Sequence, residues 1–372
     1  MPHRALVPLT LAVLTALVFA RCGAGISNVL PDRQFLIVLH TSAQEMVAWE
    51  IHRDGHLNRT GELPLAQVSP RLGGHPSGPW VYSVFTDASF QAAEVDYGSG
   101  ALKSLGTCAA PSGFAAASDL KIRSAGDLAV LGGQTGGGFV AFGIEDINPK
   151  TGGCGSRSAA TSDGATVGPI RSVAPKPSGD VFFASDTNST VFKVAYLTSG
   201  LYGFTSLSPQ SATATLLVHL AMDPLGLWAV LANEGNTSAD IFTLSPGFSH
   251  VSMGQDLGDL SSRAEFNPSG TFIAIIAEGT PNTVRILPFD EGTGSMGSSI
   301  QTVSGFGGSV DAIAYSRDGK YAYVTDTGNH RIRGFSVGST GEWTELSSSP
   351  FDTLPYTLPE DLTVITVPAT NP

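Results

Sequence analysis

Short apolar runs separated by polar turns make up the chain from residue 35 to residue 367. The runs are rich in β-branched and aromatic side chains, as in Trp80–Val84 and Tyr321–Val324. Such residues favour strands, and short runs of them bounded by glycine, proline, asparagine or aspartate are typical of strands. No segment of this range has the spacing of a helix of ordinary length. The pattern therefore predicts an all-β protein.

One turn, of the form Pro-x-Gly or a close variant, recurs along the chain. Its glycines are Gly78, Gly126, Gly179, Gly226, Gly270 and Gly319. Two positions beyond them stand Trp80, Leu128, Val181, Trp228, Phe272 and Tyr321, each at the start of a strand-like run. Proline presets φ for a turn and glycine accepts a positive φ, so each turn is expected to join two strands.

A second glycine turn recurs out of phase with the first. Its members are Gly55, Gly100, Gly152, Gly200, Gly247, Gly294 and Gly341, at intervals of 45 to 52 residues. Each unit thus reads as strand, turn, strand, polar loop, strand, glycine turn, strand, which is a four-stranded antiparallel meander. Repeated sheets of this length are the blades of β-propellers. Seven glycines of this second type predict a seven-bladed β-propeller.

The two ends of the repeat region are expected to share one blade. The first blade starts at residues 35–39 without a Pro-x-Gly turn before it, and the chain ends with a spare strand-like run over 362–367. We expect this last strand to complete the first blade, because pairing both chain ends in one sheet closes the ring. Residues 23–372 are accordingly expected to form a single propeller domain.

Composition agrees with this fold and excludes other classes of protein. The 372 residues include 44 glycines and 23 prolines, a density that would interrupt most helices. An apolar fraction of 42% provides for a core and excludes a disordered chain. Charged residues make up only 14%, against about 25% in an average soluble protein. The formal charge of −12 argues against a nucleic-acid partner, because binding phosphates needs a basic surface.

Residues 1–22 have the pattern of an export signal. Arg4 is followed by an apolar run from Ala5 to Ala20, as in a secretory signal peptide. The alternative is a membrane-anchoring helix, but the run is shorter than the about 20 residues that span a bilayer, and Pro8 interrupts it. We therefore expect an exported protein in the periplasm, in the cell envelope or outside the cell.

Three cysteines bear on the fate of the exported chain. Cys22, followed by Gly23, resembles the lipid-modified cysteine of bacterial lipoproteins, although Arg21 stands where that pattern has a small residue. Lipid anchoring through Cys22 and a free, unanchored protein are both open. Cys108 and Cys154 are either a disulfide, as their even number in an exported protein suggests, or two small buried thiols.

The repeat units resemble those of lactonase-type seven-bladed propellers, the 6-phosphogluconolactonase and carboxymuconate-cyclising family with YVTN-type repeats. The matching segments are 266–272, 316–324 and the Thr-Gly or Ser-Gly turns near 152, 200 and 341. Residues 323–332 are also similar to an NHL repeat. The resemblance covers residues 35–367 and implies the propeller fold and a lactonase activity. The Pro-His-x-His cluster that such members often carry is absent from the corresponding stretches 67–71, 217–220 and 309–312.

A column of mostly polar residues is expected to line the central channel. Counting back seven residues from each glycine of the Pro-x-Gly series gives Arg71, Asp119, Ser172, His219, Arg263 and Ala312. Arg171, Glu265 and Asp311 lie within two positions of this column. The candidates for catalysis are His219, Arg263 and Glu265, and those for substrate binding are Arg71, Arg171 and Asp311. A histidine or glutamate can activate water, and an arginine can bind a carboxylate or stabilise an oxyanion. The alternative is that these side chains are merely solvated, since propeller channels contain water.

Two functions are compatible with these observations. One is an exported lactonase-like hydrolase that opens a sugar- or organic-acid lactone in the channel, without a metal or other cofactor. The other is a non-catalytic cell-envelope propeller that binds a protein or a glycan. Either protein is expected to be a monomer and to touch a membrane only through a lipid at its N-terminus.

Overall fold

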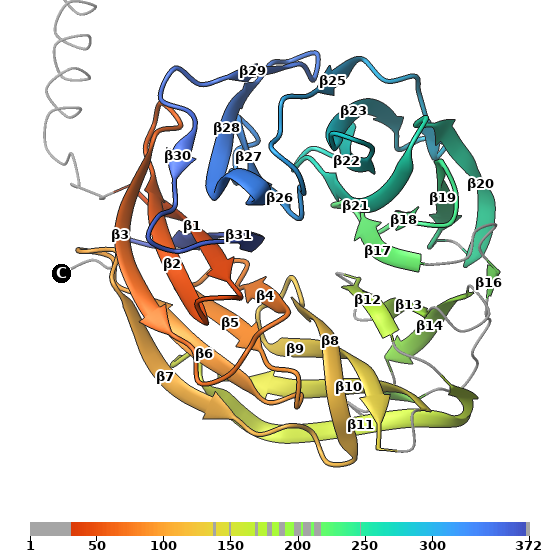
Figure 1. The fold of residues 1–372 in the computed structure, drawn as a ribbon. Coiled ribbons are helices and arrows are strands. Elements are labelled where there is room, and N and C mark those ends of the chain that lie inside the picture. Colours follow the sequence, from red (N-terminus) through yellow and green to blue (C-terminus); the bar gives the residue numbers. More distant parts are fainter. Residues whose placement is uncertain are drawn as a thin grey trace, which may run out of the picture.

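The chain forms a ring of small antiparallel sheets around a central axis (Figure 1). The computed structural model describes residues 31–369, apart from 137–138, 149, 168–169, 177–180, 186–189, 197–201, 204–209, 212–216 and 246. Within these residues the only helical element is a 3-10 turn over Thr327–Asn329. The predicted all-β propeller is confirmed. The predicted signal peptide and Cys22 lie outside the described residues, among which no helix has the length and apolar character to cross a membrane.

The strands occupy four positions from the axis outwards. The inner strands are β31 (Pro359–Val367), β4 (Arg71–Gly74), β8 (Phe114–Ile122), β12 (Ile170–Pro175), β17 (Leu217–Met222), β21 (Leu260–Phe266) and β26 (Ile313–Tyr315). The second strands are β1 (Arg33–His40), β5 (Trp80–Val84), β9 (Leu128–Thr135), β13 (Val181–Ser185), β18 (Trp228–Asn233), β22 (Phe272–Glu278) and β27 (Tyr321–Asp326).

Third and outer strands complete the sheets. The third strands are β2 (Glu45–Ile51), β6 (Phe90–Val95), β10 (Phe139–Ile147), β14 (Thr190–Tyr196), β19 (Ser238–Thr243), β23 (Thr283–Asp290) and β28 (Arg331–Val337). The outer strands are β3 (Leu57–Pro64), β7 (Leu102–Cys108), β11 (Cys154–Val167), β15 (Tyr202–Gly203), β16 (Gln210–Ser211), β20 (Ser249–Asp256), β24 (Ser295–Met296), β25 (Gln301–Val303), β29 (Trp343–Glu345) and β30 (Phe351–Asp352).

The strands pair into seven sheets, and each inner strand contacts the inner strand on either side of it. Six of these sheets are described through all of their strands. In the sheet of β12 to β16, by contrast, the connections and much of the outer edge fall outside the described residues. The propeller is thus established, whereas seven complete blades stay a prediction.

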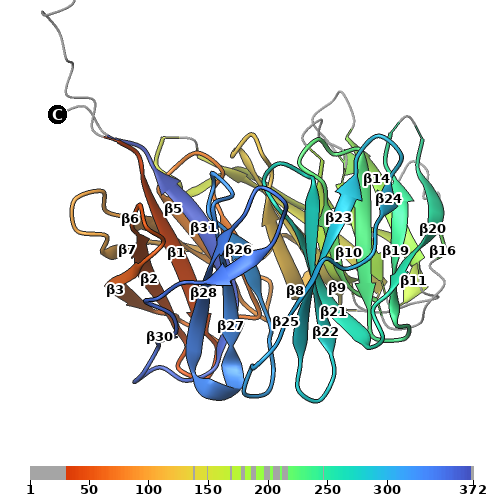
Figure 2. The same cartoon turned by 90° about the horizontal axis from the view of Figure 1, so that it is seen from above.

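The C-terminal strand closes the ring, as predicted. β31 pairs antiparallel with β1, with Leu36 opposite Val364 and Val38 opposite Leu362. β31 takes the inner position in the sheet whose other strands come from the start of the chain. The start of β1 and the end of β31 lie on one face of the ring, and the β27–β28 hairpin lies on the other (Figure 2). We call the latter the hairpin face.

Glycines of the second series lie against ring side chains of the neighbouring sheet. This contact between sheets accounts for the phase difference between the two glycine series. Gly152 has a φ of 68°, and a Cβ added there would lie 2.2 Å from Cδ1 of Trp80. In each such pair the ring belongs to the second strand of one sheet, and the glycine to the turn before the outer strand of the next. The other pairs are Gly55 with Tyr321, Gly100 with Phe35, Gly294 with Trp228 and Gly341 with Phe272. Glycine is required here by close approach as well as by its positive φ.

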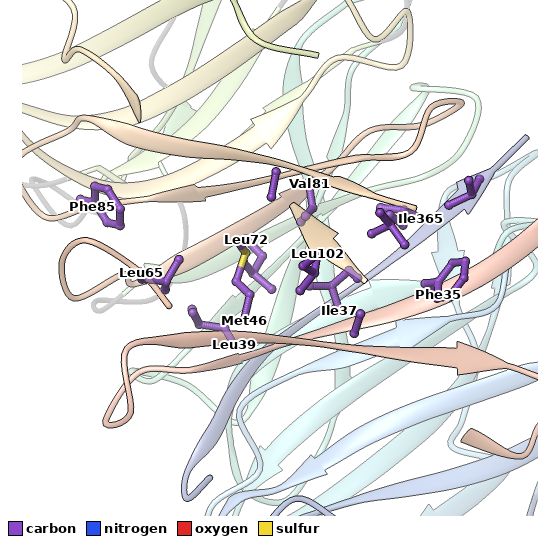
Figure 3. Packing of buried hydrophobic residues seen from close by; sticks show 14 residues of the cluster. Phe35, Ile37, Leu39, Met46, Leu65, Leu72, Val81, Phe85, Leu102 and Ile365 are labelled. Atoms are coloured by element: carbon purple, nitrogen blue, oxygen red, sulfur yellow. The ribbon is translucent and has the colours of Figure 1, made fainter. Parts of the chain in front are cut away.

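Apolar clusters between neighbouring sheets hold the ring together. In the cluster of Figure 3, Ile37 and Leu39 of β1 and Met46 of β2 lie beside Leu72 of β4 and Val81 of β5, and all five are buried. Both faces of a sheet are covered in this way, so only loops and edges remain in contact with water. This explains the low fraction of charged residues in the chain.

A disulfide joins two neighbouring sheets at their outer edges. Cys108 ends β7 and Cys154 begins β11, and the two residues form a disulfide with a Cα–Cα separation of 5.7 Å. The first of the two alternatives is therefore correct, and the two buried thiols are ruled out.

Candidate functional site

One residue from each of six inner strands, together with Ala312 just before β26, forms a ring of residues that we call the belt. The belt contains the predicted Arg71, Asp119, Ser172, His219, Arg263 and Ala312, together with Asp361. Asp119 accepts a hydrogen bond from the backbone N–H of Val173, the residue after Ser172, at 2.8 Å. Asp361 accepts one from the N–H of Leu72, the residue after Arg71, also at 2.8 Å. Asp119 and Asp361 thus each accept a hydrogen bond from the residue that follows the belt residue of the next inner strand. We therefore assign Asp361 to the belt.

A bulge precedes four of the belt residues. The pairing of the inner strand with the second strand shifts just before Asp119, Ser172, His219 and Arg263. A bulge inserts one extra residue and re-aims its neighbours. In β12 the extra residue is Arg171, which is exposed, while Ser172 is fully buried. The structure therefore separates Arg171 from the buried belt.

An ion pair crosses the belt between Arg263 and Asp361. Arg263 Nη1 lies 2.8 Å from Asp361 Oδ1, and the two side chains are 6% and 2% exposed. The same nitrogen donates to the carbonyl oxygen of Asp311 at 3.3 Å. The two residues lie on β21 and β31, with β26 between them, and the belt residue between them is Ala312, which directly precedes β26. Its short side chain leaves room for the guanidinium to reach the aspartate.

Electrostatics keep this pair charged. Burial raises the pKa of Asp361, but the positive charges of Arg263 and Arg71 and the N–H of Leu72 outweigh burial and hold this pKa below its usual value. Burial lowers the pKa of Arg263, and Asp361 and then Glu265 reverse that effect and raise it. Arg263 is therefore largely committed to Asp361.

His219 is buried and uncharged. It is 4% exposed, and among the described residues neither of its ring nitrogens forms a hydrogen bond of ordinary geometry, although the backbone of Ala264 lies close by and favours the protonated ring. Burial lowers the pKa of His219 well below its usual value, and the positive charges of Arg263, Lys121 and Arg71 lower it further. At neutral pH the ring can therefore accept a proton through one nitrogen and donate one through the other.

Four of the six predicted residues line one cavity on the hairpin face. This cavity of about 370 Å³, which we call the acidic chamber, is lined by Arg71, His219, Arg263, Asp311, Glu234, Glu278 and Glu360. Ser262, Ser309 and Thr327 also line it. Its lining is therefore rich in hydrogen-bond acceptors, with the guanidinium of Arg71 as a cation.

The remaining catalytic candidate, Glu265, lies beyond the belt, away from the hairpin face. It lines two adjoining cavities of about 300 and 230 Å³, which we call the lysine chamber after Lys121. Burial raises the pKa of Glu265, although the charges of Lys121 and Arg263 oppose the rise. His219 lines both the acidic chamber and the lysine chamber, so it stands between them.

The sequence-based prediction missed Asp361 and Lys121. Asp361 could not be found by counting back from a turn glycine, because β31 is not followed by such a turn. Lys121 lies two positions beyond Asp119 in β8, and the alternation of side chains along a strand would have placed it on the same side. Among the described residues, no group of three or more His, Cys, Asp or Glu residues is arranged to hold a metal ion.

Comparison with known proteins identifies the fold. No protein-family model matches the chain, and neither does any curated protein. The periplasmic gluconolactonase of Pseudomonas aeruginosa has a similar structure, with 14% sequence identity and a TM-score of 0.71 over 91% of this chain and 99% of the other. A candidate 6-phosphogluconolactonase from Bacteroides uniformis is similar at 14% identity and a TM-score of 0.70, over 91% of this chain and all of the other.

A protein of unknown function from Desulfotomaculum acetoxidans is also similar, at 12% identity and a TM-score of 0.69 over 90% of this chain and 99% of the other. The structural neighbours thus include 6-phosphogluconolactonase-like β-propellers. At such low identity these likenesses establish the fold alone.

Proposed function

We propose that the protein is an exported, seven-bladed lactonase-like hydrolase that opens a sugar- or organic-acid lactone in the acidic chamber. The observation that carries the proposal is the buried, neutral imidazole of His219 in a cavity that also holds Arg71. The likeness to a gluconolactonase and a candidate 6-phosphogluconolactonase supports it.

The proposed reaction uses His219 as general base and Arg71 as the cation. His219 takes a proton from a water molecule, whose oxygen adds to the lactone carbonyl carbon. The guanidinium of Arg71 opposes the negative charge that develops on the carbonyl oxygen. When the intermediate collapses, the ring C–O bond breaks and the imidazolium returns its proton to the leaving oxygen. The product is the open hydroxy acid, and the histidine is regenerated.

The rest of the chamber favours a polyhydroxylated substrate. Sugar hydroxyls are hydrogen-bond donors, and the carboxylates of Asp311, Glu278 and Glu360 supply acceptors for them. These negative charges would repel a phosphorylated lactone. Arg263 forms an ion pair with Asp361 and donates a hydrogen bond to the carbonyl of Asp311, so we assign it a positioning role in the belt. Arg71 is the residue that stabilises the oxyanion in this proposal. Arg171, which is exposed, has no part in this proposal.

Export is part of the proposal. One structural neighbour is a periplasmic protein, and residues 1–22 have the pattern of a signal peptide. Acylation of Cys22 would hold the propeller at a membrane, and mass spectrometry of the protein secreted by a bacterial host tests both steps.

The second candidate function is a non-catalytic propeller that binds a glycan or a protein at the cell envelope. The acceptor-rich lining of the acidic chamber favours glycan hydroxyls without requiring a reaction. The discriminating experiment measures hydrolysis of a panel of neutral and phosphorylated lactones by the full chain, by His219→Ala and by the control Lys103→Ala, whose residue is exposed on β7. Turnover that His219→Ala loses and Lys103→Ala keeps supports the hydrolase. The absence of turnover above spontaneous hydrolysis supports the binding protein.

A further inference from the structure

The lysine chamber is an open space because small residues surround it. The positions two residues beyond the belt are occupied by Gly73, Lys121, Ala174, Ala221, Glu265, Ala314 and Thr363. Side chains two positions apart on a strand point to the same side. Four of these seven residues are glycine or alanine, so the channel widens here around the longer side chains of Lys121 and Glu265. The result is the pair of adjoining cavities described above.

Lys121 and Glu265 face this space with opposite charges and do not meet. Both line both cavities. In the part of the chain that the structure describes, neither forms an ion pair with the other or with any other residue. Charged groups out of bulk water are stabilised by partners, and a gap between two opposite charges leaves each without one. A molecule that carries both charges would fill the gap and pair with both.

Two further buried groups belong to residues that line the same chamber. The hydroxyl of Tyr315, a residue 8% exposed, and Nε of Arg263, a residue 5% exposed, form no hydrogen bond of ordinary geometry among the described residues, although the indole of Trp343 lies beside Tyr315. Both residues line the cavity with Lys121. A phenol O–H and a guanidinium N–H are donors, as is the lysine ammonium, so these three groups suit an acceptor such as a carboxylate. Glu265 is the acceptor left over for an ammonium group.

Much of the remaining lining is apolar, beside the polar residues Ser124, His219 and Thr363. Ile122, Ile313 and Val364 line one cavity, and Leu220 and Met222 line the other. An apolar side chain can therefore be buried beside the charged groups. We infer that the lysine chamber binds a small α-amino acid with a short apolar side chain, whose carboxylate pairs with Lys121 and whose ammonium pairs with Glu265. This inference does not depend on the proposed hydrolase, which uses the acidic chamber across the belt.

The test is binding of three molecules of similar shape to the full chain, measured by isothermal titration calorimetry at neutral pH. L-Valine carries both charges, isovalerate lacks the ammonium group, and isobutylamine lacks the carboxylate. We expect valine to bind at one site per chain and each analogue to bind at least about tenfold more weakly, because each leaves the half-buried Lys121 or Glu265 without an opposite charge. Equal binding of the three molecules, or no binding of valine, would overturn the inference.

Variants assign the binding to the chamber. Lys121→Met and Glu265→Gln are expected to weaken valine binding at least about tenfold, while the exposed Lys103→Met and Glu342→Gln leave it unchanged. Ala221→Leu enlarges a lining residue that also packs in the apolar cluster with Phe266, without changing any charge, and is expected to abolish binding, with circular dichroism to confirm that the variant is folded. Binding that survives Ala221→Leu in a folded protein, or that Lys103→Met weakens as much as Lys121→Met does, contradicts the proposed location. Lactone hydrolysis by wild type remains a separate readout, so either proposal can fail alone.

Discussion

Arg263 Nη1 lies 2.8 Å from Asp361 Oδ1, and the pair is buried where the C-terminal strand closes the ring. Asp361 also accepts a hydrogen bond from the N–H of Leu72 on the next inner strand. The pair thus links the inner strands β21, β31 and β4. The carboxylate of Asp361 therefore contributes both to the closure of the propeller and to the belt of residues in its channel.

A double-mutant cycle measures this link. Arg263→Met and Asp361→Asn should each destabilise the protein by about 3–5 kcal/mol, because each leaves a buried charge without its partner. The variant with both substitutions should lose much less than the sum of the two, since neither charge remains. Urea denaturation of the four proteins gives the coupling energy. Additive losses would show that the two charges do not interact.

Acid should weaken the fold through a buried histidine near the hairpin face. His40 is 0% exposed, and burial lowers its pKa from 6.5 to about 4. Because the folded state holds this proton less well than the unfolded state, the stability is complete above pH 6.5 and is lost as pH falls from there towards 4. The shift corresponds to about 3 kcal/mol for one histidine. The urea midpoint of wild type should therefore fall over this interval, and His40→Leu should reduce the fall. An unchanged slope in His40→Leu would contradict this account.

The interlocked glycines offer a matched pair of substitutions. Gly152→Ala places a Cβ 2.2 Å from the Trp80 ring at a φ of 68°, and should cost about 1–3 kcal/mol. Gly247 belongs to the same sequence series but has no atom within 4 Å of an added Cβ, so Gly247→Ala should be nearly neutral. Thermal unfolding compares the two variants. Equal losses would mean that the ring-on-glycine contact is not what requires glycine.

The disulfide should contribute to stability chiefly by restricting the unfolded chain. Cys108 and Cys154 are 46 residues apart, and a loop of this length corresponds to about 4 kcal/mol in the chain-entropy model. The Cys108→Ser/Cys154→Ser variant should therefore unfold at a clearly lower urea concentration than the oxidised wild type. Reduced wild type serves as the control and should match the variant.

Much of this fold could be predicted from the sequence because its turns are local and periodic. The positions of a turn glycine and of the apolar residue two positions later follow from the backbone conformation of the turn. Counting back from Gly226 and Gly270 then located His219 and Arg263. The strand β31 could be recognised as a spare strand. The packing of Trp80 over Gly152 is not local, and only the relative phase of the two series hinted at it.

The pairing and division of the channel residues could not be predicted in the same way. Arg263 reaches Asp361 only because Ala312 lies between them with a short side chain, a relation that links distant parts of the chain. The bulge in β12 exposes Arg171, although counting along the strand placed it next to the channel. Whether Glu265 faces the acidic or the lysine chamber depends on how side chains alternate after such a bulge. That alternation depends on the register of the inner strand with the second strand, which the sequence pattern does not give.

The central claim is that His219 acts as a neutral general base in the acidic chamber. Its most direct test is the pH dependence of kcat/KM for a neutral sugar lactone, with spontaneous hydrolysis subtracted, in wild type and in His219→Ala. Because burial and neighbouring positive charges hold the pKa of His219 well below 6.5, the wild-type value should stay level as pH falls from 8 to 6, and His219→Ala should be lower by about 10²–10⁴-fold throughout. Equal activity of the two proteins would contradict the claim.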